Sequence, residues 1–445
     1  MSATVTETAP LELTKLDTKG SQSHQSIHRL PKDRPDPSTP TSKANANGGS
    51  TSPTRTSTVE EANVPPNEGT AKEHKRRELV SFVSLCWCLF LAGWNDGTLG
   101  PMIPRIREVY NVGFTVVSLI FVIACIGFCT GALFNAYFTG KIAFGKIIVI
   151  GCALQTIAYA IMAGAPPFPV FVIAFFINGF GLAVQDAQAN GFVAALRDHT
   201  KMGILHAVYG LGAFCVPLVA TQFAQMDRWS FHFLTSLGLA LSTVVVNTLV
   251  FKFNTEDECL IMIGREPGEK NDSNEKSNVR QLMGIKAVHL LAAFICIYVG
   301  IEVTIGGWTV TYIIEERGGG PSSGYISSGF FGGLTLGRVA LLWVNKKVGE
   351  RRVVYLYTLL AIGFEIMVWF LPSLVGGAVA VSIVGFLLGP LYPIAMNHAA
   401  RILPRWLLTA SIGWIAGIGQ AGSALLPFIT GAFASRFGIV SLQPL

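Results

Sequence analysis

The segment NGFGLAVQDAQAN, at residues 178–190, places a carboxylic acid inside an otherwise apolar run that extends over residues 170–196. A helix needs about 20 apolar residues to cross the hydrocarbon of a bilayer, so this run is long enough to span one. An ionised Asp at the centre of such a helix costs roughly 2.5–3.5 kcal/mol, and Asp186 must therefore face something other than lipid. Other polar side chains recur on one broad face at helical spacing, namely Asn178, Gln185, Gln188 and Asn190. The segment predicts the wall of a polar cavity in a membrane protein.

The composition supports this class of protein. Of 445 residues, 51% are hydrophobic and only 13% are charged, against about 25% charged in soluble domains. Only Cys259 among the cysteines lies in a polar loop, so we expect neither structural disulfides nor a metal site. The net charge of +6 comes from basic residues at helix ends, which membrane topology explains without a nucleic-acid partner. The chain has no nucleophile motif, phosphate loop or metal-ligand spacing, so we expect neither an enzyme nor a cofactor.

The chain divides into a tail and two groups of apolar runs. Residues 1–77 are rich in Ser, Thr, Pro, Asn and charge, which predicts a disordered tail without a secretory signal. A first bundle at residues 78–251 contains six runs, at 79–100, 114–138, 147–165, 170–196, 202–224 and 229–251. After a polar linker at residues 252–283, a second bundle at 284–445 contains five, at 285–313, 322–344, 352–371, 374–399 and 406–432. Eleven membrane-spanning helices are therefore predicted.

The distribution of Lys and Arg over the short loops predicts a cytoplasmic N-terminus. The loops on the outer side then contain only Arg105, Arg107, Arg228, Arg317 and Arg436. The loops on the inner side contain Lys72, Lys75, Arg76, Arg77, Lys141, Lys146, Arg197, Lys201, Lys346, Lys347, Arg351, Arg352, Arg401 and Arg405. We favour the plasma membrane over the vacuole or another internal membrane.

An internal repeat relates the two bundles. Gly210 and Gly212 match Gly417 and Gly419 at a separation of 207 residues, since 417 − 210 = 207. The same offset relates three further pairs, which are Gly93 with Gly300, Asn95 with Glu302 and Asn190 with Asn397. Such symmetry between halves is common in transporters. Extended to the run at 229–251, the offset predicts a twelfth helix near 436–458, whereas the sequence stops at Leu445. We expect either that this helix is truncated or that it is missing and leaves a lipid-facing groove beside the eleventh.

Several motifs resemble the major facilitator superfamily, and in particular a fungal branch of its fucose:proton symporter group. AGWNDGTLGPMIP at residues 92–104 resembles the group's asparagine–aspartate–proline signature in helix 1, and QDAQANGF at 185–192 resembles its helix 4 segment. GIEVTIGGW at 300–308 and GLTLGR at 333–338 are similar to the fungal branch. The resemblance implies two six-helix bundles related by a pseudo-twofold axis. Gly140 departs from the family pattern, because the loop after helix 2 usually has an acid there.

Three carboxylates are the candidates for proton coupling, since a low-dielectric cavity lets protonation respond to a neighbouring ligand. They are Asp96, Asp186 and Glu302. The resemblance implies that the helix 1 acid cycles a proton and that the helix 4 acid links proton and sugar binding. The repeat places Glu302 opposite Asp96. The alternative for each acid is a permanent hydrogen-bonded or ionic partner. We interpret Glu365 as peripheral and expect Arg338 to reach toward the cytoplasm.

Further polar and aromatic residues are candidates for solute binding. They are Asn95, Gln185, Asn190, His206, Tyr209, Trp308, Asn397 and Gln420. His206 and Tyr209 lie one turn apart in HAVYGLG, which resembles the family's sugar-facing helix 5. A histidine on an apolar helix is alternatively a satisfied core residue. Trp308 is alternatively part of the aromatic belt at the membrane interface.

The sequence therefore predicts a secondary transporter that works by alternating access, in which the two halves rock around a site at mid-membrane. We expect a monomer in the lipid bilayer that carries out proton-coupled symport of a small polar solute, with a sugar favoured and sodium left open as the coupling ion. The second hypothesis for the function is a proton-coupled exporter of drugs or metabolites. The third hypothesis is a nutrient sensor that signals without transport.

Overall fold

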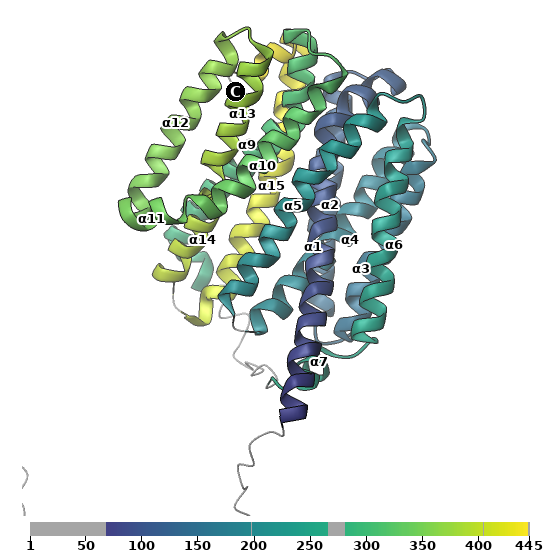
Figure 1. The fold of residues 1–445 in the computed structure, drawn as a ribbon, viewed down its shortest axis with the longest axis vertical. Coiled ribbons are helices and arrows are strands. Elements are labelled where there is room, and N and C mark those ends of the chain that lie inside the picture. The colour runs from purple at the N-terminus through teal and green to yellow at the C-terminus, as the bar shows by residue number, and fades with distance from the viewer. Residues whose placement is uncertain (1–67, 197, 266–280, 404, 444–445) are drawn as a thin grey trace, which may run out of the picture. The chain divides into compact units, whose positions relative to one another are not determined.

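The computed structural model describes residues 68–443, apart from residues 197, 266–280 and 404. Within this part of the chain the regular structure is helical, with one isolated bridge between Thr139 and Ile142. Ten of the described helices are long and apolar enough to cross a membrane, or eleven spans if a bent helix pair counts as one. The expected all-α membrane fold is confirmed (Figure 1). Residues 1–67 of the tail expected to be disordered at 1–77, and the middle of the linker, lie outside the described residues; residues 68–77 belong to a helix, which corrects the expectation for that part of the tail.

Six long helices form the first half. Their bounds are α1 (Glu68–Tyr110), α2 (Phe114–Phe138), α3 (Phe144–Ala163), α4 (Phe168–Ala195), α5 (His199–Ala224) and α6 (His232–Phe251), with the short turn η1 (Trp229–Phe231) before α6. All but α1 begin close to the predicted runs. Helix α1 begins at Glu68 instead of residue 78, and Glu73 pairs there with Arg76 at 3.0 Å and with Arg77 at 2.9 Å. Such pairs along one face stabilise a helix that apolar periodicity does not reveal.

The polar linker, which was predicted without regular structure of its own, contains a short helix, α7 (Glu256–Met262). Thr255 and Glu258 form a capping box at its start, with the Thr255 hydroxyl accepting from the Glu258 N–H and the Glu258 carboxylate accepting from the Thr255 N–H. This pattern satisfies donors that would otherwise be unpaired at a helix start. We refer to the end of the bundle at which α7 lies as the linker end.

Charged side chains at the linker end hold the start of α1 against the linker and α5. The Glu78 carboxylate accepts hydrogen bonds from Lys201 and, at 3.3 Å, from Arg265. Asp198 caps α5 by accepting from the Thr200 N–H at 2.9 Å. Burial opposes the charge on Asp198, but the backbone N–H groups of Thr200 and Lys201 lower the pKa of this carboxyl below its usual value. The capping carboxylate is therefore ionised at neutral pH.

The second half contains five spans, two of them broken. Its helices are α9 (Lys286–Arg317), α10 (Tyr325–Ala340), α11 (Leu342–Val348), α12 (Glu350–Phe370), α13 (Leu374–Leu388), α14 (Leu391–Ile402) and α15 (Arg405–Phe437), with short turns η2 (Pro321–Gly324) and η3 (Ile439–Leu442). The predicted helix at 322–344 is bent by 50° between α10 and α11. The predicted helix at 374–399 is interrupted between α13 and α14, where Pro390 has no N–H to continue the ladder.

Within each half, glycines bring one pair of helices into close contact, and the two pairs are equivalent. A Cβ added to Gly93 of α1 would lie 1.8 Å from the Tyr209 carbonyl oxygen of α5, and one added to Gly212 of α5 would lie 2.1 Å from the Phe90 oxygen. In the second half, a Cβ on Gly422 of α15 would lie 1.9 Å from the Cys296 oxygen of α9. Only glycine permits such backbone approach, which is common where transmembrane helices cross. The α1–α5 and α9–α15 pairs correspond under the repeat offset.

The polar contacts between the halves concentrate at the end of the bundle opposite the linker end, which we call the η2 end. Arg107 of α1 forms an ion pair with Glu315 of α9, and Gln222 of α5 donates to the Tyr325 hydroxyl of α10. Gln225 also donates to the Pro321 carbonyl oxygen at 3.2 Å. These contacts hold the halves together at the η2 end.

Candidate functional site

The α1–α5 crossing positions the first carboxylate. Gly93 and Gly97 let α5 approach, since a Cβ on Gly97 would lie 2.5 Å from the Ala213 carbonyl oxygen. At this crossing the Tyr209 hydroxyl donates to Oδ2 of Asp96 at 2.5 Å. Asp96 is exposed, whereas the two residues that follow it, Gly97 and Thr98, are buried. The carboxylate is thus held on one side by α5 and open on the other.

Asn95 connects Asp96 to two further helices. Its amide donates to Oδ1 of Asp96 at 3.1 Å, and its oxygen accepts from the Tyr159 hydroxyl of α3 at 3.3 Å. The Asn178 amide of α4 donates to the same oxygen. Because its oxygen accepts from two protein groups and its amide donates to Asp96, Asn95 orients Asp96 in this conformation. Tyr159 and Asn178 belong to this network, and Tyr159 was not among the residues predicted from the sequence.

The second carboxylate, Asp186, is partly exposed on α4. Asn190, one turn later, donates through Nδ2 to Asp186 Oδ1 and to the Asp186 carbonyl oxygen, both at 2.9 Å. These bonds fix the side chain of Asn190 against its own helix and leave the second oxygen of the carboxylate available. The i,i+4 spacing that brings the two together is visible in the sequence.

The remaining polar residues of α4 point to different neighbours, which corrects the prediction of one cavity-lining face. Gln185 is buried and donates to Gln155 of α3 at 2.5 Å. Gln188 donates to Asn135 of α2 at 2.5 Å. Gln185 therefore lies inside the first half and not at the candidate site. Helical spacing predicted the angular spread of these side chains but not the helices that surround them.

The buried Gln155–Gln185 pair gives a test of this placement. Replacing Gln185 by Leu leaves the Gln155 amide buried without its partner, which costs about 1–3 kcal/mol. We expect the Gln185→Leu protein to unfold at a clearly lower temperature and the Gln155→Leu/Gln185→Leu protein to recover most of that loss. Thermal unfolding followed by size-exclusion chromatography measures both. Equal losses in the single and double variants would show that the two amides do not interact.

In the second half, Glu302 of α9 faces Arg338 of α10, with 3.7 Å between Arg338 Nη2 and Glu302 Oε1. Both side chains are largely buried, 12% and 18% exposed. The expectation that Arg338 reaches toward the cytoplasm is therefore wrong, because the carboxylate holds the guanidinium inside the bundle. The sequence carried a signal for this pair, since a charged residue within a membrane helix usually has an opposite charge nearby.

These groups of the two halves lie within electrostatic reach of one another. Asp96 interacts with the charge of Glu302, and His206 of α5 with that of Arg338. Asp186 lies within reach of Asp96 and of Tyr392 on α14. Three carboxylates and one guanidinium leave an excess of negative charge when all are ionised. Such a site favours uptake of protons or another cation.

The other residues predicted to bind solute are divided into those that are exposed, wholly or in part, and one that is buried. His206 and Asn397 are exposed, and Gln420 is partly exposed, with its side-chain oxygen accepting from Ser423 at 3.2 Å. Trp308 is fully buried: its indole N–H donates to the Pro427 carbonyl oxygen at 3.1 Å, and its ring packs near Phe114 and Phe121 of α2. Trp308 has no free face for stacking in this conformation, because it fills the contact between the halves.

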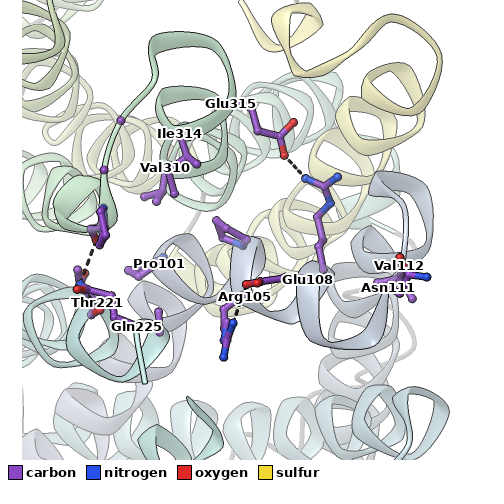
Figure 2. A pocket seen from close by; sticks show the side chains of 17 residues that line it. Pro101, Arg105, Glu108, Asn111, Val112, Thr221, Gln225, Val310, Ile314 and Glu315 are labelled. Atoms are coloured by element: carbon purple, nitrogen blue, oxygen red, sulfur yellow. Dashed lines mark hydrogen bonds and ion pairs between the residues drawn. The ribbon is translucent and has the colours of Figure 1, made fainter. Parts of the chain in front are cut away.

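A pocket of about 640 Å³ lies at the η2 end, between α1, α5, α9 and the η2 loop. In Figure 2, Pro101, Val310 and Ile314 form apolar parts of its wall, and Glu315 points toward the α1 arginine with which it pairs. The arginine is Arg107, whose guanidinium also lies 3.5 Å from the centre of the Phe114 ring. The Arg107–Glu315 ion pair therefore joins the two halves beside this pocket.

Within the described part of the chain, no three His, Cys, Asp or Glu side chains are grouped so that they could hold a metal ion. Glu365 of α12 is partly buried, and its Oε1 atom has no hydrogen-bond partner in the structure. Its helix packs mainly on α13 and α11, away from the α1–α5 crossing.

Comparison with known proteins adds sequence and fold relationships to this geometry. Residues 85–427 match the family model described as Major Facilitator Superfamily. "Bypass of stop codon protein 6" of Saccharomyces cerevisiae is 26% identical over 385 residues, which cover 80% of this chain and 78% of that protein. The glucose/mannose transporter GlcP of Bacillus subtilis is 19% identical over 349 residues, covering 77% and 85%. The crystal structure of the E. coli fucose:proton symporter superposes with a TM-score of 0.58 at 16% identity, covering 84% of this chain and 96% of that one.

Proposed function

Because the chain belongs to the Major Facilitator Superfamily, we propose that it is a secondary transporter that couples proton movement to symport of a sugar or a similar small polar solute. The observation that carries the proposal is the Asp96 carboxylate, which Tyr209 and Asn95 hold while its other side stays exposed. A carboxylate in this setting can exchange a proton in response to a bound solute. Glu302, which pairs with Arg338, lies within electrostatic reach of this carboxylate from the other half.

The cycle is alternating access around this site. The excess of Lys and Arg in the loops at the linker end supports a cytoplasmic N-terminus. In that orientation the Arg107–Glu315 pair and the Gln222–Tyr325 bond close the outer side. The exposed His206 and Asn397, which lie nearer the linker end of their helices, then face the cytoplasm. The conformation is accordingly the one that exchanges solute with the cell interior.

A polyhydroxylated solute fits the chemistry of the open groups. Asp96, Asp186, His206 and Asn397 are exposed or partly exposed, and they offer oxygen and nitrogen atoms that can pair with hydroxyl groups. Two of the relatives are named for the sugars glucose, mannose and fucose, which supports the same solute class. A net negative site disfavours anionic solutes unless protons bind with them.

Replacing Asp186 by Asn tests the coupling. We expect Asp186→Asn to keep exchange of labelled solute across proteoliposome membranes and to lose uptake driven by a proton gradient, because the amide cannot take up the proton that links solute binding to the gradient. A panel of hexoses supplies the solute, and a sodium gradient replaces the proton gradient in a parallel series. Gradient-driven uptake at the unaltered rate in the variant would exclude Asp186 from coupling.

Asp198→Asn serves as a matched control, since it removes the same charge at the α5 cap and not at the site. We expect this control to retain gradient-driven uptake. If the unaltered protein takes up none of the hexoses under either gradient, the proposed symport of sugar fails. If uptake follows sodium alone, the proton is the wrong coupling ion.

A further inference from the structure

The turn between α11 and α12, which we call the α11–α12 elbow, is short and well fixed. Helix α11 leaves α10 at an angle of 50° and lies at the outer edge of the second half, beside the start of α12 (Figure 1). A single residue, Gly349, separates the two helices, and its φ of 96° is one that glycine adopts without strain. The buried Tyr357 hydroxyl of α12 donates to Oδ1 of Asn345 on α11 at 2.8 Å. This bond holds the side chains on the two sides of the turn close to one another.

Exposed basic side chains surround the elbow. They are Lys346 and Lys347 on α11 and Arg351 and Arg352 on α12. The acid of the same turn, Glu350, is already neutralised, with 2.7 Å between its Oε2 atom and Nη1 of Arg401. Within the described part of the chain, no acidic side chain pairs with the four basic ones. The elbow therefore presents four positive charges that the protein itself does not offset.

Helix α12 continues from the elbow as an apolar stripe. Exposed side chains recur along it every three or four residues, which places them on one face of the helix. They are Tyr355, Leu359, Ile362 and Ile366, which are 49–78% exposed. Arg351 and Arg352 lie four and three residues before Tyr355, so both fall on this face one turn nearer the linker end. Because the 21 residues of α12 match the thickness of about 30 Å of the hydrocarbon, these arginines lie at the level of the lipid headgroups.

Helix α11 adds an aromatic side chain at the same level. The Trp343 indole is 67% exposed, and the Lys347 ammonium lies 4.9 Å from the centre of its six-membered or five-membered ring system. Tryptophan concentrates at the boundary between hydrocarbon and headgroups, because its ring is apolar and its N–H group is polar. The exposed Trp343 indicates that α11 lies along the membrane surface, with the Lys347 ammonium at the depth of the headgroups.

The excess of basic residues on the cytoplasmic side explains the sign of this charge but not its arrangement. At the start of α1, by comparison, Arg76 and Arg77 are paired with Glu73. At the elbow the basic side chains come from two helices, lack acidic partners and stand at the head of an apolar stripe. Such a cluster attracts a phosphate group, and the adjoining stripe favours a phosphate that carries hydrocarbon chains.

We propose that the α11–α12 elbow binds one anionic phospholipid of the leaflet at the linker end. The headgroup phosphate accepts hydrogen bonds from Arg351 and Arg352, whose planar forks fit pairs of phosphate oxygens. Lys346 and Lys347 offset the remaining negative charge of the headgroup from the side of α11. The acyl chains lie along the apolar stripe of α12. A lipid bound in this way joins α11 to α12 and stabilises the bend between α10 and α11.

Lipid titration of the purified full-length protein tests this inference. The protein in detergent is titrated with dioleoylphosphatidylglycerol or with dioleoylphosphatidylcholine, and native mass spectrometry counts the lipids that stay bound. We expect one site to bind phosphatidylglycerol at least about tenfold more tightly than phosphatidylcholine. Arg351→Gln/Arg352→Gln should weaken this site about thirtyfold, since each basic residue near an anionic surface contributes about fivefold. Lys346→Gln/Lys347→Gln changes α11 alone and should also weaken the site, which keeps the inference testable if the arginine variant does not fold.

Lys72→Gln/Lys75→Gln is the matched control, because it removes the same charge from two exposed residues at the start of α1. It should bind phosphatidylglycerol as the unaltered protein does. An equal loss in this control would show that overall charge attracts the lipid, and would overturn the inference. Equal affinity for the two phospholipids would overturn it too, as would undiminished binding by either folded elbow variant.

Glycerophosphoglycerol, which is the same headgroup without acyl chains, separates a lipid site from a general anion site. It should compete with the intact lipid only weakly, because it makes no contact with the apolar stripe. If glycerophosphoglycerol or inorganic phosphate binds as tightly as phosphatidylglycerol, the elbow is an anion site and the proposal of a lipid is wrong. Thermal unfolding gives a second readout, since a bound lipid should raise the unfolding temperature of the unaltered protein and of the control more than that of the elbow variants.

Discussion

Asp96→Asn should reduce uptake driven by a proton gradient to the level of empty liposomes. The amide keeps the size of the carboxylate and can still accept from Tyr209, so the α1–α5 crossing is preserved. The amide cannot bind the proton. A proton gradient shifts the populations of the transporter's conformations only if some group binds a proton more tightly in one conformation than in the other. Uptake of labelled hexose into proteoliposomes, with and without an imposed pH difference, measures the effect.

Tyr209→Phe tests the effect of the hydrogen bond to Asp96 separately from the effect of the carboxylate itself. It removes the hydroxyl that donates to Asp96 at 2.5 Å and leaves the acid in place. Since a hydrogen bond to a charged group contributes about 1.5–3 kcal/mol, the proton affinity of the site should change about 10-fold to 100-fold, with coupled uptake retained over a shifted pH range. Asp96→Asn with undiminished gradient-driven uptake would rule out the central role of this acid.

The apolar runs were sufficient to predict the number and order of the spans, and the motifs at residues 92–104 and 185–192 were sufficient to predict the family, which the match over residues 85–427 confirms. Periodicity fails where charge pairs replace apolar contacts, as at Glu73 with Arg76 and Arg77 in the first turns of α1. It also fails at the bend after Ala340, because the apolar residues continue through that position without interruption. The break at Pro390 did carry a signal in the sequence.

The candidate site was predicted in part. Asp96 and Tyr209 were identified on separate helices, and the structure brings their side chains together. Gln185 and Trp308 were assigned to solute binding, but the structure buries both against neighbouring helices. Helical spacing gives the direction of a side chain relative to its own axis, whereas its partner depends on which helix packs there. The Glu302–Arg338 pair illustrates the same limit, since it joins residues 36 positions apart through the packing of α9 on α10.

Packing of α1 on α5 links the stability of the fold to the function of the site. Gly93 and Gly97 allow the backbones to approach, and Asp96 lies between these glycines on the same helix. The 2.5 Å bond from Tyr209 to Asp96 exists only while the helices remain at this separation. Any side chain added at the crossing should therefore weaken both the protein and the geometry of the carboxylate.

Gly93→Ala should destabilise the protein by about 1–3 kcal/mol or more, the usual cost of overpacking, since its Cβ would lie 1.8 Å from a backbone oxygen that cannot rotate away. Gly93→Leu should not be recovered as a folded protein. Gly238→Ala in α6, where the added Cβ meets nothing within 4 Å, is the matched control. It should be neutral or stabilising, because Ala is favoured over Gly in a helix by about 1 kcal/mol.

Thermal unfolding monitored by size-exclusion chromatography measures these differences, and uptake by the folded fraction measures their effect on the site. Gly422→Ala in the second half meets the Cys296 oxygen at 1.9 Å and should lower the unfolding temperature to a similar degree. Because the α9–α15 crossing does not contact Asp96 through a hydrogen bond, the folded fraction of Gly422→Ala should retain more gradient-driven uptake than that of Gly93→Ala. If Gly93→Ala and Gly238→Ala unfold at the same temperature, close backbone contact between α1 and α5 is not what holds Tyr209 against Asp96.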